Sequence, residues 1–385
     1  MVFNFKYFEE FILGKTVWLR HETKPFERRS ALTPEACRTL AMLGHNVVIE
    51  SSANRIYKDE EFKRLGLKIV KPNSWITDAP KGAIVVGLKE LEDQDFPLIH
   101  RHIHFAHVYK GQEGSTKMLS RFIQGEGKLY DLEYLTNSDG KRVSAFGIWA
   151  GFVGAALAVN TWSYNQKGLH YNDKAPLEEW ENSNALISDV LSNFEDLNMK
   201  PRVLIIGARG RCGTGAIKLL RSIGIDPVCW STKDTKGIGP IEEILDFDIL
   251  INCALAKKPR PPFLNAEILK KERNLKVISD VACDPTGPCN PLPIYNQITT
   301  MDLPILNMDY NGELLITAID HLPSLLPRES SEDYCDQLLP HLIDFLDNKI
   351  EKSPWERSLE IFYHKTMELG IKDELIIDPD SNKLM

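Results

Sequence analysis

The sequence has no excess of basic residues and no apolar run long enough to cross a membrane. Its 46 Lys and Arg residues against 54 Asp and Glu residues give a formal net charge of −8. Nucleic-acid-binding proteins normally show a basic excess or stripe, so this balance argues against such a partner. The longest apolar stretch, residues 146–159, is shorter than the about 20 residues of a membrane-spanning helix. We expect no membrane association and interpret this stretch as a tightly packed helix.

Cysteine is sparse and forms no recognisable motif. Seven cysteines are scattered along the chain, and none forms a C-x-x-C pair. An odd, scattered set is typical of free thiols in a reducing compartment. Residues 1–16 lack the basic start and the small-residue cleavage site of a secretory signal. The sequence therefore predicts a cytoplasmic protein.

Length and pattern favour two α/β domains. The 385 residues are 43% hydrophobic and 26% charged, as in ordinary globular proteins, and at roughly 150 residues per domain two are expected. Apolar runs alternate with helical segments twice, which is typical of two Rossmann-like, doubly wound parallel sheets. The expected strands are residues 16–20, 46–50, 68–70 and 83–87, then 203–206, 228–230, 248–252 and 276–280.

The tail from Ser330 is predicted to be helical, because residues 336–350 have apolar side chains three and four apart, and we expect it to return to the first domain. We therefore expect a substrate domain of residues 1–145 plus 325–385 and a dinucleotide-binding domain of residues 146–324. The active site is expected in the cleft between them.

A glycine-rich loop follows the first strand of the second domain. In VLIIGARGRCGTGA, residues 203–216, Gly210, Gly213 and Gly215 separate a buried strand from a helix. Glycine permits close approach of a pyrophosphate, and a helix N-terminus favours an anion. The spacing is G-x-x-G-x-x-G, so a tight strand-to-helix turn without a ligand is the alternative. The surrounding strand, helix and second strand favour cofactor binding.

The end of the second strand leaves the choice of cofactor open. An NAD site usually has Asp or Glu there, to bind the ribose hydroxyls. This chain has Ser231, with Asp234 three residues later and Lys233 and Lys236 nearby. Lysines at this place could also accommodate a 2′-phosphate, so these residues do not decide between NAD and NADP.

Several titratable residues of the first domain are candidates for chemistry. Lys89 and Glu90 follow a buried strand, at the edge where open α/β sheets bind ligands. His107 has a reference pKa of about 6.5, which suits acid–base work. The alternating His100, His102 and His104 have no cysteine or carboxylate at ligand spacing, which argues against a metal site.

Charged residues in three further strings, Glu133 in LYDLE, Arg142 in KR and Arg29 in ETKPFERR, complete the candidates. Arg29 and Arg142 could each bind a carboxylate through two parallel hydrogen bonds. Taken alone, each of these residues is more often a solvated surface charge than a ligand.

Taken together, the motifs resemble one family. ETKPFERRSALTP, GLKE, FAHVYKGQ, LYDLE, AFGIWAGFVGAA, IGARGRCGTGA, DVACDPTGPCNPLPIY and IDHLPSLLPRE occur in order from about Arg20 to Glu329. They resemble the fungal NAD-dependent, lysine-forming saccharopine dehydrogenases, within the alanine dehydrogenase and transhydrogenase superfamily. The resemblance implies oxidation of saccharopine to L-lysine and 2-oxoglutarate, the last step of the α-aminoadipate route to lysine. It also implies a monomeric enzyme.

The resemblance assigns roles residue by residue. Lys89 matches the family's proton acceptor and His107 its proton donor, while Glu90 and Glu133 match acidic residues that tune them. Matches to substrate contacts are Arg29, Lys110, Gln112, Arg142, Phe146, Ala282, Cys283 and Asp284, with Lys24 as a helper. Matches to NAD contacts are Lys141, Gly210, Arg211, Ser231, Thr235, Leu255, Val281, Ile319, Asp320, His321 and Leu322.

The chain departs from the family at two cofactor positions. Ser231 stands where the family has its ribose-binding Asp, and Lys141 where it has an Arg. Cys212 and Cys253 match a cysteine pair that can cross-link near the cofactor loop, so a disulfide between oxidation-sensitive thiols is expected. Two alternatives stay open: an NADP-using or other opine-type dehydrogenase, and a catalytically silent binding protein with the same fold.

Overall fold

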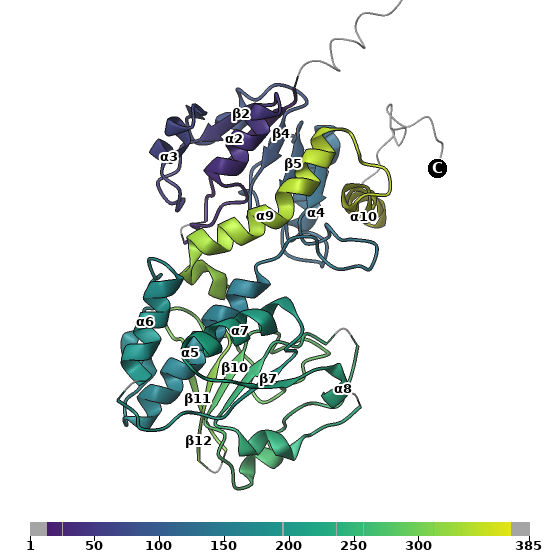
Figure 1. The fold of residues 1–385 in the computed structure, drawn as a ribbon. Coiled ribbons are helices and arrows are strands. Elements are labelled where there is room, and N and C mark those ends of the chain that lie inside the picture. The colour runs from purple at the N-terminus through teal and green to yellow at the C-terminus, as the bar shows by residue number, and fades with distance from the viewer. Residues whose placement is uncertain are drawn as a thin grey trace, which may run out of the picture. The chain divides into compact units, whose positions relative to one another are not determined.

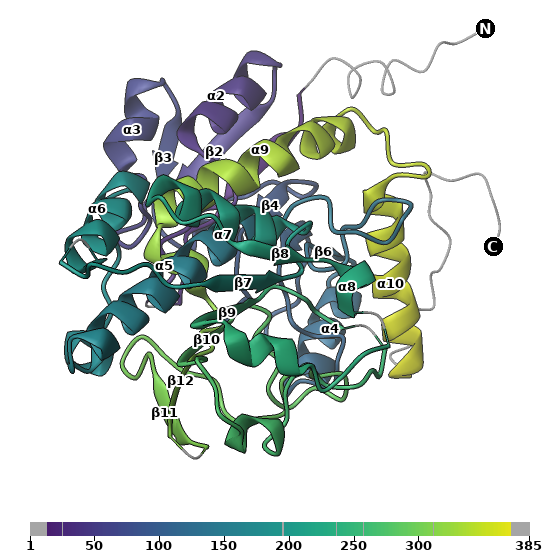
Figure 2. The ribbon, with the colours of Figure 1, turned by 60° about the horizontal axis from the view of Figure 1, so that its bottom comes forward.

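The computed structural model describes residues 14–24, 26–194, 196–235, 237–256, 258–310 and 312–370. By contacts the chain divides into two units, Met1–Ala145 with Ser331–Met385, and Phe146–Ser330. Each unit contains a six-stranded sheet with helices packed on it (Figures 1 and 2). The predicted fold class, two Rossmann-like α/β sheets, is confirmed.

The sheet of the first unit is parallel throughout, in the order β3-β2-β1-β4-β5-β6. Its strands are β1 (Thr16–Leu19), β2 (Asn46–Glu50), β3 (Lys68–Val70), β4 (Ile84–Val86), β5 (Arg101–His104) and β6 (Lys128–Asp131). The chain runs outward from β1 to β3 and starts again at β4, so the strand order reverses between β1 and β4. Open α/β sheets bind ligands outside the carboxyl ends of the strands at such a point.

Helices and one 3₁₀ turn complete the first unit: α2 (Pro34–Met42), α3 (Asp59–Arg64), η1 (Ser74–Ile76), α4 (Ser115–Gln124), α9 (Pro327–Leu346, from Ser331 onward) and α10 (Pro354–Glu368). Thr33 starts α2, because its hydroxyl accepts the Ala36 amide and Pro34 needs no partner at the first helical position. The C-terminal helix α10 packs against β6, and the Ser358 hydroxyl donates to the carbonyl of Asp131.

The second unit has strand order β11-β12-β10-β9-β7-β8, with β11 alone antiparallel among the described strands. The strands are β7 (Val203–Ile206), β8 (Val228–Trp230), β9 (Ile249–Asn252), β10 (Val277–Asp280), β11 (Leu306–Asp309) and β12 (Glu313–Thr317). The helices are α5 (Gly147–Gln166), η2 (Tyr171–Lys174), α6 (Ser183–Phe194), α7 (Arg211–Ser222), α8 (Thr232–Thr235), η3 (Glu242–Asp246), η4 (Ile268–Lys270) and η5 (Leu322–Leu325). Here the strand order reverses between β7 and β9.

Two glycines let α5 and α7 pack backbone against backbone. A Cβ on Gly151 would lie 1.8 Å from the carbonyl oxygen of Cys212, and one on Gly215 would lie 1.8 Å from that of Ile148. This packing explains the apolar run in α5, whose residues from Gly151 to Tyr164 are all buried. No helix in the described part of the chain is long and apolar enough to span a membrane.

Candidate active site

The backbone of Lys89 is held on both sides by a buried ion pair. Glu22 accepts the amides of Leu88 and Lys89 at 2.6 and 2.9 Å, while Arg20 donates to the Lys89 carbonyl. Arg20 and Glu22 also pair with each other at 3.4 Å and are both buried. Because these residues follow β1 and Lys89 follows β4, the strand-order reversal is what brings them together.

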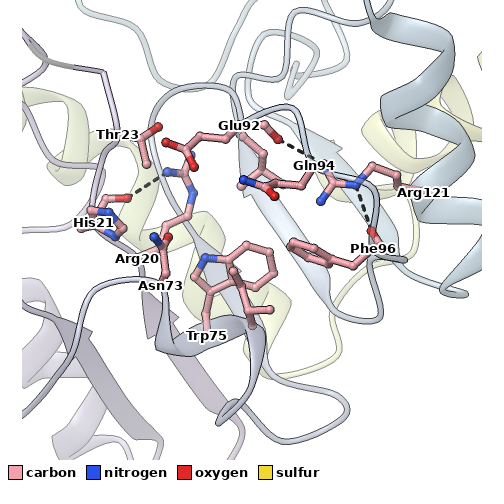
Figure 3. A pocket seen from close by; sticks show the side chains of 11 residues that line it. Arg20, His21, Thr23, Asn73, Trp75, Glu92, Gln94, Phe96 and Arg121 are labelled. Carbon is pink, nitrogen blue, oxygen red and sulfur yellow. Dashed lines mark hydrogen bonds between the residues drawn. The ribbon is translucent and has the colours of Figure 1, made fainter.

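A small cavity lies beside the Arg20–Glu22 ion pair, and two arginines bind the segment of residues 89–96 that lines it (Figure 3). The cavity measures about 100 Å³. Arg20 donates to the carbonyls of His21 and Lys89, and Arg121 donates to those of Glu92 and Phe96 at 3.1 and 2.9 Å. The segment that starts with Lys89 is thus attached at both ends by buried guanidinium groups.

The side chain of Lys89 points to a second buried carboxylate. Its Nζ lies 3.8 Å from Oε2 of Glu27, and the Lys89 side chain is 29% exposed against 3% for Glu27. Arg29 binds the same carboxylate through Nε and Nη2 at 2.8 and 2.6 Å. Burial would raise the pKa of Glu27, but the adjacent Arg29 and Lys89 hold it below its usual value. The expected carboxylate-binding Arg29 therefore already has a carboxylate partner within its own loop.

His107 and Glu90 lie on neighbouring loops at the same edge of the sheet. His107 follows β5, is exposed, and stacks on Phe105 with ring centroids 6.4 Å apart. Its φ of 54° is uncommon for a residue other than glycine, and such strain concentrates at functional sites. Burial acts to raise the pKa of Glu90, but the hydrogen bond from Lys24 at 2.6 Å and the neighbouring His107 hold it below its usual value.

Glu133 follows β6 and pairs with Lys110 at 2.7 Å, which raises the pKa of that lysine. Between the two loops lies Asp131, which is fully buried. Asp131 accepts the amides of Ala106 and Glu133 at 3.3 and 2.8 Å, so it joins the His107 loop to the Glu133 loop. Lys89, His107 and Glu133 thus follow the adjacent strands β4, β5 and β6 at their carboxyl ends.

Burial raises the pKa of Asp131 to about 7, and this predicts a pH-dependent stability. The protonated carboxyl contributes stability that is fully present below the unfolded pKa near 4 and is lost as the pH rises towards about 7. Asp131→Asn cannot titrate. Between pH 5 and pH 8 the wild type should therefore lose about 3 kcal/mol of unfolding free energy relative to this variant, as measured by urea unfolding. The exposed Asp139→Asn serves as the matched control, and equal pH profiles for wild type and Asp131→Asn would contradict the assignment.

The remaining predicted residues of this unit are exposed or half-buried. Gln112 accepts the Lys110 amide at 2.8 Å, and the Lys141 amide donates to Asn137 at 2.9 Å. Arg142 and Lys141 are exposed on the segment after β6. Of the expected substrate contacts, the structure thus brings Lys110 beside Glu133, with Gln112 bound to the Lys110 amide.

The three alternating histidines are core residues. His102 packs on Trp75 and Phe122, with ring centroids 5.1 and 5.3 Å apart. Burial lowers the pKa of His102 and His104 well below the usual value, so both are neutral. Within the described residues, no group of three or more His, Cys, Asp or Glu side chains is arranged to hold a metal ion.

The glycine loop of the second unit has the geometry of a dinucleotide turn. Gly207 ends β7 with φ +84°, and a Cβ there would lie 2.8 Å from the backbone of Cys253. A Cβ on Gly213 would lie 2.5 Å from Cα of Ala208. Gly210 precedes α7 with no side-chain cap, and α7 begins at Arg211. The helix N-terminus therefore presents backbone amides, which suits a diphosphate.

A cavity of about 240 Å³ opens beside this loop, at the strand-order reversal between β7 and β9. Three predicted cofactor residues line it: Ser231, Thr235 and Leu255. Leu255 is 58% exposed, an apolar surface that fits a flat base. The residues present therefore fit an adenine dinucleotide. The residues that the sequence did not indicate are Thr232, Ala254, Ala256, Lys258, Arg260, Phe263 and Pro291.

The other predicted residues of this unit follow β10 and β12, two paired strands. Val281, Ala282, Cys283 and Asp284 follow β10, and Cys283 has φ 48° and donates its thiol to the Ala318 carbonyl at 3.1 Å. Ile319, Asp320, His321 and Leu322 come after β12, where Ile319 and Leu322 are buried. Phe146 directly precedes α5.

The expected disulfide is not formed. Cys212 lies in the first turn of α7 and Cys253 follows β9, and both are free thiols, as are the other five cysteines. Burial raises the pKa of Cys253 well above its usual value, and the nearby Cys212 raises it further. A thiol that stays protonated is a poor nucleophile for disulfide formation.

Comparison with known proteins defines the class. The family described as alanine dehydrogenase/PNT, N-terminal domain, matches residues 18–153. An L-alanine dehydrogenase structure aligns with a TM-score of 0.59 at 16% identity, over 90% of this chain and 93% of the other. A transhydrogenase from Sinorhizobium meliloti aligns at 0.56 and 17% identity, over 88% and 95%. The fold is that of the alanine dehydrogenase and transhydrogenase class.

More similar relatives identify the family within this class. A saccharopine dehydrogenase (NAD+, L-lysine-forming) from Emericella nidulans is 43% identical over 367 residues, which cover 92% of this chain and 98% of the relative. The protein of the same name from Yarrowia lipolytica is 44% identical over 362 residues, which cover 91% and 98%. The chain belongs to the saccharopine dehydrogenase family, as its motifs predicted.

Proposed function

We propose that this protein is an NAD-dependent dehydrogenase that oxidises saccharopine to L-lysine and 2-oxoglutarate, the last step of the α-aminoadipate route to lysine. The observation that supports this most is 43% identity to a relative of that name over 92% of the chain. Two features of the structure, one in each unit, support the proposal independently of this identity. One unit places Lys89, His107 and Glu133 after adjacent strands, and the other has a cavity beside a glycine loop.

Saccharopine is a secondary amine, and its oxidation begins with loss of a proton from that nitrogen. We assign this proton to Nζ of Lys89, which must itself be neutral when it accepts it. Glu27 at 3.8 Å then stabilises the ammonium that forms. NAD, when bound, supplies the acceptor for the hydride. Water adds to the resulting imine, and His107 moves the protons that release lysine and 2-oxoglutarate.

The charged residues around Lys89 and His107 suit a substrate with three carboxylates. We assign carboxylate binding to Arg29, Lys110, Gln112 and Arg142, as the family resemblance implies. Glu27 already binds Arg29 through two hydrogen bonds, so a substrate carboxylate must compete with it there. Glu90 and Glu133 carry the negative charges that balance Lys24 and Lys110.

In the second unit, Gly210 and Arg211 are proposed to hold the diphosphate, and Ser231, Thr235 and Leu255 the adenosine. We also propose a monomeric, cytoplasmic protein. The scattered free thiols support the cytoplasmic assignment, since reducing compartments keep cysteines reduced.

The test is NADH oxidation, followed by absorbance, when lysine and 2-oxoglutarate are added to the purified protein. We expect oxidation only when both are present. Pyruvate with ammonia is the matched control, because alanine dehydrogenases share this fold. Oxidation with the control pair instead would replace our assignment with another dehydrogenase, and none with either pair would favour the silent binding protein.

A further inference from the structure

The residue that directly follows β8, beside the cofactor cavity, is the neutral Ser231. In dinucleotide-binding sheets a carboxylate at this point accepts the ribose hydroxyls and selects NAD, whereas cations here accept a 2′-phosphate. Ser231 follows β8, and both Ser231 and Lys258 line the cavity. By residue type alone, this position does not select NAD.

Asp234, three residues after Ser231, supplies a carboxylate at the end of this strand. Both the amide and the hydroxyl of Ser231 donate to Oδ2 of Asp234, at 2.7 and 2.9 Å. These bonds fix the carboxylate of Asp234 at the end of β8 and hold its pKa below the usual value. Both bonds from Ser231 end on Oδ2, and the side chain is exposed, so a ribose hydroxyl can approach the carboxylate at Oδ1.

Of the cations near this site, Arg209 lowers the pKa of the Asp234 carboxyl, and Arg260 is bound to backbone carbonyls. Arg260 lines the cavity, but its Nη2 donates to the Thr235 carbonyl at 2.6 Å and its Nε to the Pro261 carbonyl at 3.2 Å. Its guanidinium also lies 4.0 Å from the ring centre of Phe263. An arginine held in this way lacks the free paired donors that a 2′-phosphate needs.

We infer that Asp234, oriented by Ser231, accepts the ribose hydroxyls of the adenosine half and makes this protein prefer NAD to NADP. This inference rests on the proposed function. The Asp234 carboxylate on the Ser231 amide, with the Lys233 amide donating to Oγ of Ser231 at 3.3 Å, also caps the start of α8, which alone explains a local turn. The two roles predict different results. Loss of a helix cap should weaken the binding of NADH and NADPH equally, whereas loss of a ribose acceptor should change the ratio of their dissociation constants.

The experiment measures dissociation constants for NADH and NADPH by nicotinamide fluorescence on the full chain. The wild type should bind NADH at least about tenfold more tightly than NADPH. Asp234→Asn should weaken NADH binding about tenfold and leave NADPH binding unchanged or tighter. The matched control is Asp226→Asn, an exposed carboxylate before the same strand that pairs with Arg221, and it should leave both constants unchanged.

A double variant tests the position itself. Ser231→Asp combined with Asp234→Asn puts the carboxylate directly on the strand end and should restore NADH affinity to within about threefold of wild type. An unchanged NADH-to-NADPH ratio in Asp234→Asn, or a wild type that prefers NADPH, would overturn the inference and leave the dehydrogenase assignment standing. A wild type that binds neither cofactor would contradict the proposed function as well.

Discussion

Lys89→Met should lower turnover by about 10²–10⁴-fold, the range that a positioned general base contributes. Methionine keeps the length of the side chain and removes the amine. The fold should survive, because the backbone of Lys89 and not its side chain is held by Arg20 and Glu22. Initial rates of NADH oxidation with saturating lysine and 2-oxoglutarate measure the loss, and circular dichroism checks the fold.

The matched control lies at the other end of the same strand. Lys81 precedes β4, is 80% exposed at its side chain, and pairs with Glu126 only at 3.9 Å. Lys81→Met should therefore keep wild-type turnover. His107→Gln should show a loss comparable to that of Lys89→Met, since both groups move protons in the proposed reaction. Wild-type turnover in Lys89→Met would exclude this lysine as the base.

Gly215→Ala should destabilise the second unit by about 3 kcal/mol, the upper end of the usual cost of overpacking. In an open helix the same change would stabilise, by up to about 1 kcal/mol, because alanine has the higher helix propensity. Here the new Cβ would lie 1.8 Å from the Ile148 carbonyl oxygen and 3.0 Å from the Phe152 amide nitrogen. Both are backbone atoms, so α5 and α7 must separate, and overpacking of this kind costs about 1–3 kcal/mol or more.

Scanning calorimetry on the full chain checks this, with an expected fall in Tm of roughly 6–12 °C. Gly210→Ala is the matched control for stability, because its φ is −81° and the nearest atom to its Cβ lies 3.4 Å away. It should shift the Tm by less than about 3 °C. An unchanged or higher Tm in Gly215→Ala would show that the two helices are not in backbone contact.

The sequence predicted the parallel strands β1–β4 and β7–β10 but not β5, β6 or β12. Central strands such as β4 and β7 are buried along their whole length, which makes them continuous apolar runs, and β2, β3, β7 and β8 have the predicted bounds. The edge strands β3 and β8 are partly exposed. The helix α9 begins at Pro327, three residues before the predicted start at Ser330. Its first turns contain Ser330 and Ser331, both fully buried, so polar residues occupy core positions that the apolar pattern cannot identify.

Lys89, His107 and Glu133 could be named from the motifs, but their supporting carboxylates could not. Glu22, Glu27 and Asp131 were ordinary charges in the sequence, and each is buried in the structure against a specific partner. Burial of a charge depends on which loops meet at the sheet edge, and that is a property of strand order. Asp234 could not be identified from the sequence either, because its position at the end of β8 depends on its hydrogen bonds to Ser231.

The sequence alone determined the fold class, the family and the residue types available for proton transfer, because apolar runs, glycine spacing and motif order are local properties of the chain. Only the tertiary structure decided that Arg29 is bound to Glu27, that Cys212 and Cys253 remain free thiols, and that one buried ion pair holds the backbone of Lys89. The thiol and Lys89 features depend on distances between residues far apart in sequence, which parallel strand pairing and backbone packing set, and the Arg29–Glu27 contact depends on the conformation of its loop.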